Sequence, residues 1–253
     1  MLNYYPPRYL FRRHEILRRL ERGRCFLEIG GGSLLLAQEL LAFFDAGIVL
    51  EPAQEARKKW ADLPEPLKVR LRLEGRPLEE FTAGMAFDCV VACEVLEHVD
   101  DDLAMVRQMF SLLRPQGRLV ISVPARRHFW SVHDQLVGHL RRYEKEELLH
   151  LFNQAGFMKI QVISYGFPFV NLLRWPRILL AQIGRAKKMA WDQQRRTRES
   201  GINQVAGFHS WLGLLVNPIT IWPLCRMATL FNGYFWSDGC IVVAIRPSGE
   251  KRG

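Results

Sequence analysis

Three consecutive glycines, Gly30 to Gly32, stand between a short apolar run and a helical pattern near the start of the chain. The run Arg24–Ile29 is typical of a buried strand, and Leu34–Phe44 is typical of a helix. Glycine reaches positive φ angles and lets a ligand approach the backbone closely, because it has no Cβ atom. The pattern predicts a tight strand-to-helix turn whose N–H groups suit a polar ligand, with a turn that binds nothing as the alternative.

The rest of the chain continues this alternation of strands and helices. Short strands that alternate with helices predict right-handed βαβ units and a mainly parallel sheet, and therefore an α/β fold. The further strands are expected at Gly47–Glu51, Lys68–Leu73, Phe87–Ala92, Arg118–Val123, Phe157–Ser164 and Gly239–Arg246. The further helices are expected at Gln54–Asp62, Asp101–Leu113 and Glu144–Ala155, with a basic amphipathic helix within Met1–Arg24.

One long segment, Tyr165–Asp238, breaks the alternation between the sixth and the seventh expected strand. It holds five of the seven tryptophans of the chain, so its composition differs from that of its surroundings. We therefore divide the chain into an α/β domain over residues 1–164 and 239–253 and an aromatic, basic helical insertion over residues 165–238. We expect the insertion to cover the substrate or to contact a membrane.

The composition is that of an ordinary globular protein with an excess of positive charge. The chain has 253 residues, 49% of them hydrophobic, and a formal net charge of +9, which points to an anionic partner. Its five cysteines show no zinc-site spacing and are odd in number, so we expect a reducing cytoplasm, no disulfide framework and no metal site. The first twenty residues carry five arginines and no unbroken apolar run, so we expect no cleaved signal peptide.

Two glutamates accompany the glycine turn. Glu28 lies inside the apolar first strand, where a carboxylate without a partner is costly. Glu51 ends the second strand, a place where an acidic residue commonly binds the hydroxyls of a ribose. The third glycine of a dinucleotide fingerprint would fall at Leu35, and no P-loop lysine follows the turn. These observations favour a nucleoside ligand, and a nicotinamide enzyme stays open as an alternative.

Four motifs, in order along the chain, carry a resemblance to a known family. They are Leu27-Glu-Ile-Gly-Gly-Gly, Val49-Leu-Glu-Pro, Phe87-Asp-Cys-Val-Val-Ala-Cys-Glu-Val-Leu-Glu-His-Val and Leu112-Leu-Arg-Pro-Gln-Gly-Arg-Leu-Val-Ile-Ser-Val-Pro. Over residues 24–163 the sequence resembles the class I S-adenosylmethionine-dependent methyltransferases, and among them the quinone-biosynthesis O-methyltransferases. The resemblance implies a Rossmann-like, seven-stranded, mostly parallel sheet of order 3-2-1-4-5-7-6 with helices on both faces and the helical insertion before the last strand.

The resemblance also implies a site for S-adenosylmethionine across the carboxyl ends of the first four strands. The glycines and Glu28 would lie at the methionine part of the cofactor, and Glu51 would bind the ribose hydroxyls. The family often has an acid near the adenine where this chain has Arg76. The cofactor-binding residues so implied are Glu28, Gly30, Gly31, Gly32, Glu51, Pro52, Arg76, Cys93 and Glu94.

Histidines follow the fourth and the fifth expected strands, where side chains could reach the transferred methyl group. A positioned base accelerates the methylation of a hydroxyl by about 10²–10⁴-fold. The candidate bases are His98, His133 and His139, and the candidate acceptor-binding residues are Trp130, Asp134, Arg141, Arg142 and Tyr143. In the alternative, His98 only helps to start the next helix, and Asp134, His139 and Arg142 form a salt-bridged lid.

The sequence as a whole predicts an S-adenosylmethionine-dependent methyltransferase that methylates a small amphiphilic or lipid-linked acceptor at oxygen. A non-catalytic scaffold that binds the cofactor at a membrane or in a complex is the alternative. Basic runs at Met1–Arg24 and Arg177–Arg198, together with the tryptophans, favour an anionic membrane surface as a partner, reached from the cytoplasm at the inner membrane face. No nucleic-acid-binding module is recognisable, so nucleic acid is not expected as a partner.

Overall fold

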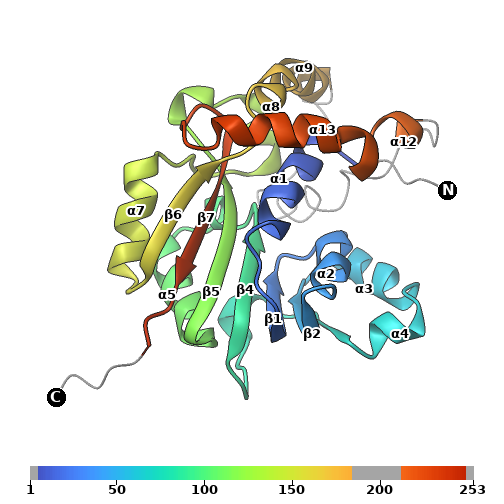
Figure 1. The fold of residues 1–253 in the computed structure, drawn as a ribbon, viewed down its shortest axis with the longest axis vertical. Coiled ribbons are helices and arrows are strands. Elements are labelled where there is room, and N and C mark those ends of the chain that lie inside the picture. Colours follow the sequence, from blue (N-terminus) through green and yellow to red (C-terminus); the bar gives the residue numbers. More distant parts are fainter. Residues whose placement is uncertain (1–4, 184–211, 249–253) are drawn as a thin grey trace.

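A single seven-stranded sheet forms the centre of the computed structural model, which describes residues 5–183 and 212–248 (Figure 1). The strand order is β3-β2-β1-β4-β5-β7-β6. Strands β1 to β5 run parallel, and β7 pairs antiparallel with both β5 and β6. The strands are β1 (Gly23–Ile29), β2 (Phe44–Leu50), β3 (Leu71–Glu74), β4 (Phe87–Cys93), β5 (Leu113–Pro124), β6 (Met158–Ser164) and β7 (Gly239–Ile245). The predicted Rossmann-like α/β fold and its strand order are confirmed.

Helices cover both faces of the sheet. The strands carry apolar side chains on both faces, and each set is buried beneath helices. On one face α5 (Asp102–Leu112) and α7 (Lys145–Gln154) bury Met109 and Phe152 against the strands. On the other face α1 (Pro7–Leu17), α2 (Leu35–Leu40) and α13 (Pro218–Ala228) bury Phe11 and Leu40. The remaining elements of this part of the chain are α3 (Gln54–Ala61), α4 (Glu65–Lys68), α6 (Val132–Val137) and the short 3₁₀ helices η1 (Leu78–Glu80), η2 (Leu96–His98) and η3 (Arg127–Phe129).

Three predicted boundaries were wrong by several residues. The helix expected to run to Phe44 ends at Leu40, and Phe44 instead opens β2, where its ring packs 5.5 Å from that of Phe26. Strand β3 begins at Leu71 rather than Lys68, because α4 occupies the residues after Pro64. Strand β5 begins already at Leu113, five residues before the expected start.

The insertion packs into the same core as the N-terminal helix. After β6 come α8 (Phe169–Leu172), α9 (Arg174–Ile183), α12 (Leu212–Leu215), α13 and η4 (Thr229–Phe231). Cys225 and Ala228 of α13 share a buried cluster with Phe11. Trp191, Trp211 and the greater part of the basic run at 177–198 lie outside the described residues.

Helices α8, α9 and α13 gather at the end of the sheet where β7 begins, next to α1 (Figure 1). Pro124, the last residue of β5, pairs there with Gly239, so this is the edge at which the parallel strands end. Within the described ranges no helix is both long enough and apolar enough to cross a bilayer.

Candidate active site

The glycine turn lies at the carboxyl end of β1 and leads into α2. Gly30 and Gly32 have positive φ angles of 73° and 42°. A Cβ atom on Gly31 would lie 2.2 Å from Cγ1 of Val49, so only glycine fits at this position. Leu34, which stands where the family often has another glycine, is fully buried and also has a positive φ, of 60°. The predicted tight strand-to-helix turn is therefore present and fixed by close packing within the protein, and its role in binding stays a prediction.

Glu51 follows β2 and binds the glycine turn directly. The N–H of Gly32 donates to its Oε2 over 2.8 Å, and the N–H of Ala53 donates to its Oε1 over 3.0 Å. Pro52 lies between these residues and ends the strand. Each carboxylate oxygen has a second lone pair, so the held side chain can still accept hydrogen bonds from a ligand.

Glu28 is buried in β1 beneath the turn. Burial, with the charge of Glu51, raises its pKa to about 8. The N–H of Ala37 bonds to this carboxyl group, but Oε2 has no hydrogen-bond partner among the described residues. That oxygen lies 3.5 Å from the place a Cβ of Gly31 would occupy. An unsatisfied buried acceptor costs about 1–3 kcal/mol, so this oxygen is suited to a donor supplied by a ligand.

Two arginines of α1 meet the carboxyl end of β4. Glu94 directly follows this strand, accepts a hydrogen bond from Ser122 Oγ over 3.1 Å, and pairs with Arg8 at 3.1 Å and Arg12 at 3.5 Å. Arg8 also binds Asp238 at 2.8 Å, just before β7. Burial acts to raise the pKa of Glu94, but the two arginines lower it to about 2. Sequence reasoning missed both arginines, because the only signal, a basic helix, is also typical of a solvent-exposed face.

Cys93 and Arg76, two other predicted cofactor-binding residues, differ in their exposure to solvent. Burial raises the pKa of the Cys93 thiol to about 12, so this thiol is unreactive. Arg76 is half exposed and binds Glu74 at 3.2 Å. Glu74, the last residue of β3, is joined to Glu51 by a backbone hydrogen bond of 2.9 Å. The structure thus brings Glu74, which the sequence analysis did not select, next to the predicted ribose-binding residue.

Two of the three candidate bases meet after β4. The rings of His98 and His139 lie edge to face with their centroids 5.0 Å apart, and Nε2 of His139 is 3.5 Å from Oε1 of Glu97. Glu97 is fully buried, and neither of its oxygens accepts a hydrogen bond from a residue that the structure describes. Burial, and then the charge of Glu94, raises its pKa. Glu97, His98 and His139 offer ligand atoms within 4.8 Å of one another, a grouping that could hold a divalent cation and that the sequence analysis did not anticipate.

Asp134 orients His139. Its Oδ1 lies 2.9 Å from Nδ1 of His139 and 2.8 Å from Nη2 of Arg142, and its Oδ2 accepts from the N–H and Oγ of Ser131. Burial opposes ionisation of Asp134, but His139 and Arg142 hold its pKa well below the usual range. The ion pairs expected among Asp134, His139 and Arg142 are present in the structure, and their role as a lid stays a prediction. In contrast, Nδ1 of His98 lies 3.1 Å from the carbonyl oxygen of Gly138, and burial lowers the pKa of His98 to about 4.

Trp130 and His133 belong to the same connection after β5. Trp130 is exposed and follows η3, and His133 is half-buried on α6, one residue before Asp134. The catalytic role of His133 and the acceptor-binding role of Trp130 stay predictions.

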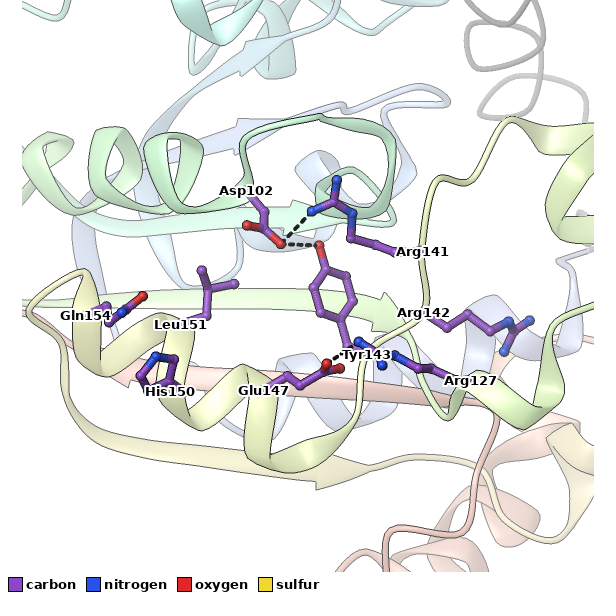
Figure 2. A pocket seen from close by; sticks show the side chains of 9 residues that line it. All are labelled: Asp102, Arg127, Arg141, Arg142, Tyr143, Glu147, His150, Leu151 and Gln154. Atoms are coloured by element: carbon purple, nitrogen blue, oxygen red, sulfur yellow. Dashed lines mark hydrogen bonds and ion pairs between the residues drawn. The ribbon is translucent and has the colours of Figure 1, made fainter.

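A polar cavity of about 340 Å³ adjoins this connection (Figure 2). Three predicted acceptor residues, Arg141, Arg142 and Tyr143, line it together with residues of α7. The hydroxyl of Tyr143 lies 3.1 Å from Oδ2 of Asp102, and Arg141 Nη1 binds the same oxygen at 3.0 Å. Figure 2 shows Tyr143 and Arg141 converging on Asp102, whereas the guanidinium of Arg142 points away from it. The cavity is therefore bounded by internally paired charges.

The sequence of this chain matches a known protein family. A family model described as a methyltransferase domain matches residues 1–162, which is more than half of the chain. The chain belongs to this methyltransferase family. A probable S-adenosylmethionine-dependent methyltransferase of Mycolicibacterium smegmatis is 30% identical to it over 197 residues, which cover 74% of this chain and 76% of that protein.

One further relative and one solved structure define the extent of the likeness. A ubiquinone biosynthesis O-methyltransferase of Xanthomonas campestris is 35% identical over 104 residues, 40% of this chain and only 43% of its own length. The YcgJ protein of Bacillus subtilis shares the fold, with a TM-score of 0.60 at 13% identity over 94% of this chain and 99% of its own. The protein is an S-adenosylmethionine-dependent methyltransferase, and the family match favours catalysis over the scaffold alternative.

Proposed function

We propose that this methyltransferase transfers a methyl group from S-adenosylmethionine to a hydroxyl of a small amphiphilic or lipid-linked acceptor. The observation that carries the methyl donor in this proposal is the carboxylate of Glu51, hydrogen-bonded to Gly32 beside the unpartnered oxygen of Glu28. For the acceptor, the likeness to the Xanthomonas protein, a ubiquinone biosynthesis O-methyltransferase, supports oxygen as the methylated atom.

The residues around the turn fit the cofactor. Glu51 offers lone pairs to the ribose hydroxyls, and Gly31 lets the turn pack closely on Val49 and Glu28. The buried oxygen of Glu28 would accept an N–H of the ligand. Arg8 and Arg12 would bind the carboxylate of the cofactor, since guanidinium groups bind carboxylates strongly. When bound, the cofactor supplies a methyl group on a positively charged sulfur atom.

His139 is the residue that we assign as the base for the acceptor hydroxyl. Because Asp134 binds Nδ1, the proton of the neutral ring stays on that nitrogen and Nε2 is the atom that accepts. Nε2 faces the buried carboxyl group of Glu97, a region sheltered from water. His98 is a weaker candidate, because burial makes its ring a poor proton acceptor near neutral pH.

The test is transfer to hydroxyl acceptors, with the release of S-adenosylhomocysteine as the readout. We expect the enzyme to methylate catechols or prenylated phenols, and His139→Ala to lower kcat by about 10²–10⁴-fold with unchanged affinity for S-adenosylhomocysteine. His128→Ala, on the exposed surface of η3, is the matched control and should keep full activity. Transfer to amines alone, or full activity of His139→Ala, would refute the respective assignment.

A lipid-linked acceptor resides in a membrane. We therefore place the enzyme in the cytoplasm, bound peripherally to the inner membrane face while it works. The exposed apolar side chains of the insertion support this location, whereas the arginines of α1 are paired with acidic residues of the protein.

A further inference from the structure

The insertion exposes large apolar side chains at one end of the molecule. Of the fifteen large hydrophobic residues that are exposed in the described chain, eleven lie between Leu172 and Trp236. Trp175 is 71% exposed, Ile219 76% and Leu230 77%. Trp175 lies on α9, Ile219 on α13 and Leu230 on η4, directly after α13. Figure 1 shows α8, α9 and α13 together beyond the carboxyl ends of the parallel strands. Exposed apolar surfaces of this kind mark sites of interaction with a partner.

Several of these side chains are held rigidly by other aromatic rings. Tyr234 stacks on Trp236 with centroids 4.5 Å apart, and Phe167 lies edge-on against both Trp236 and Phe231 at 5.3 Å and 5.5 Å. Rigid tryptophan and tyrosine side chains are typical of surfaces in the polar boundary of a bilayer, because one end of the ring is apolar and the other forms hydrogen bonds.

Two arginines border this surface and lack an acidic partner among the described residues. The guanidinium carbons of Arg126 and Arg174 lie 5.4 Å and 4.9 Å from the ring centroid of Phe129. Arg126 donates to the carbonyl oxygen of Trp236 over 3.4 Å, and Arg174 directly precedes Trp175. No ion pair joins either guanidinium group to an acidic side chain among the residues that the structure describes. Both cations can therefore pair with an anion supplied from outside.

The charges that the insertion itself contributes to the surface are positive. Its described side chains from Tyr165 to Ser237 include Arg174 and Arg226 and no aspartate or glutamate. The acidic residues near Arg174, Asp238 and Asp134, are already paired with Arg8 and Arg142. A bilayer with anionic head groups satisfies both features, because its phosphates bind guanidinium groups and its acyl region accepts the apolar side chains. An apolar protein partner would leave the two arginines beside Phe129 without an anion.

We propose that a docking surface formed by Trp175, Trp222, Leu230 and Trp236 binds anionic phospholipid membranes, with Arg126 and Arg174 at the head-group phosphates. This inference rests on the proposed function. Docking through this surface turns the carboxyl ends of β4 and β5 toward the membrane, where a lipid-linked acceptor is held. Arg126 is two residues from Pro124, the end of β5, so the head-group site adjoins the candidate active site.

The experiment is co-sedimentation of the full chain with vesicles of phosphatidylcholine alone or mixed with phosphatidylglycerol. We expect strong binding only to the mixed vesicles. The double variant Arg126→Gln, Arg174→Gln should weaken this binding by about 25-fold, about fivefold for each cation. Arg107→Gln, an exposed arginine on α5, is the matched control and should bind like the unaltered protein.

The apolar part of the surface is tested with Trp222→Ser and Leu230→Ser, two separate variants at exposed positions. Each should weaken binding to the mixed vesicles, whereas Val69→Ser, at an 85% exposed residue of another region, should not. Circular dichroism and binding of S-adenosylhomocysteine identify any variant that fails to fold. If one of the two serine variants fails to fold, the vesicle binding of the other tests the apolar part of the surface.

Three results would overturn the inference: no binding to mixed vesicles, equal loss with the control variants, or a dimer that Leu230→Ser dissociates. The last result, seen by analytical ultracentrifugation, would mean that a second copy covers the surface. The vesicle assay needs neither cofactor nor acceptor. A failure of membrane binding is therefore distinguishable from a failure of methyl transfer.

Discussion

Replacing Asp134 by asparagine would leave a buried arginine without its counter-charge. Arg142 is 2% exposed, and its guanidinium binds Oδ1 of Asp134 through both Nε and Nη2 at 2.9 Å and 2.8 Å. Its Nη1 donates to the carbonyl oxygens of Ala125 and Asp238, which asparagine would leave in place. Asparagine keeps the shape of the side chain and can still accept hydrogen bonds, but it carries no negative charge.

The expected loss follows from the burial of this pair. Removing one partner of a buried ion pair costs about 3–5 kcal/mol, because the other charge stays out of water. The two carbonyl partners of Arg142 remain, so we expect Asp134→Asn to lower the free energy of unfolding by about 3 kcal/mol. Glu147→Gln is the matched control. It breaks an ion pair with Arg127 whose side chains are 68% and 39% exposed, and an exposed pair contributes less than about 1 kcal/mol.

Urea unfolding at neutral pH measures these differences, and a double-mutant cycle identifies their cause. In Asp134→Asn with Arg142→Met no charge remains unpaired, so the double variant should lose about 2 kcal/mol less than the sum of the two single losses. Losses that simply add, or an Asp134→Asn variant no less stable than Glu147→Gln, would refute the reasoning.

Two further predictions concern the glycine turn. Gly31→Ala should abolish binding of S-adenosylhomocysteine in a calorimetric titration. It should also destabilise the fold by about 1–3 kcal/mol, because the new Cβ meets Val49. Gly84→Ala, where nothing lies within 4 Å of the new Cβ, is the control and should change neither the binding nor the stability. Glu28→Gln should flatten the pH dependence of stability. The pKa of Glu28 is about 8 in the fold, above its ordinary 4.5, so the unaltered protein loses on the order of 4 kcal/mol as pH rises from 4.5 to 8. Thermal unfolding measured across this pH range checks the prediction, and parallel curves for the two proteins would contradict it.

The glycine turn and its carboxylate could be predicted from the sequence because their determinants are local. Gly32 and Glu51 are 19 residues apart, at the ends of two adjacent parallel strands, and the strand pattern alone brings them to one edge of the sheet. The α/β class and the mainly parallel sheet followed from the same alternation, whereas the strand order came from the family resemblance. Boundaries were less certain, because residues such as Phe44 fit a helix and a strand equally and only the contact with Phe26 decides between them.

The pairing of Arg8 and Arg12 with Glu94 could not be predicted in this way. The partners lie on elements more than eighty residues apart in the chain, and the ion pairs depend on how α1 crosses the end of the sheet. The local sequence shows only that the N-terminal helix is basic and that an acidic residue, Glu94, follows a strand. The same holds for Glu97, whose position in a short apolar segment gives no sign that its oxygens meet no donor in the described structure.

The four buried carboxyl groups of the site divide according to their cationic neighbours. Glu94 and Asp134 each contact guanidinium groups, and their pKa values lie below the usual range despite burial. Glu28 and Glu97 accept no ion pair from an arginine in the described chain, and burial raises their pKa values. At neutral pH Glu94 and Asp134 are therefore ionised and Glu28 is largely protonated. The site thus places fixed negative charge after β4 and beside His139, and keeps a neutral hydrogen-bonding group beneath the turn. A cationic ligand seated on the turn would favour ionisation of Glu28, because a nearby positive charge lowers a carboxyl pKa, so ligand binding and proton release at this residue are coupled.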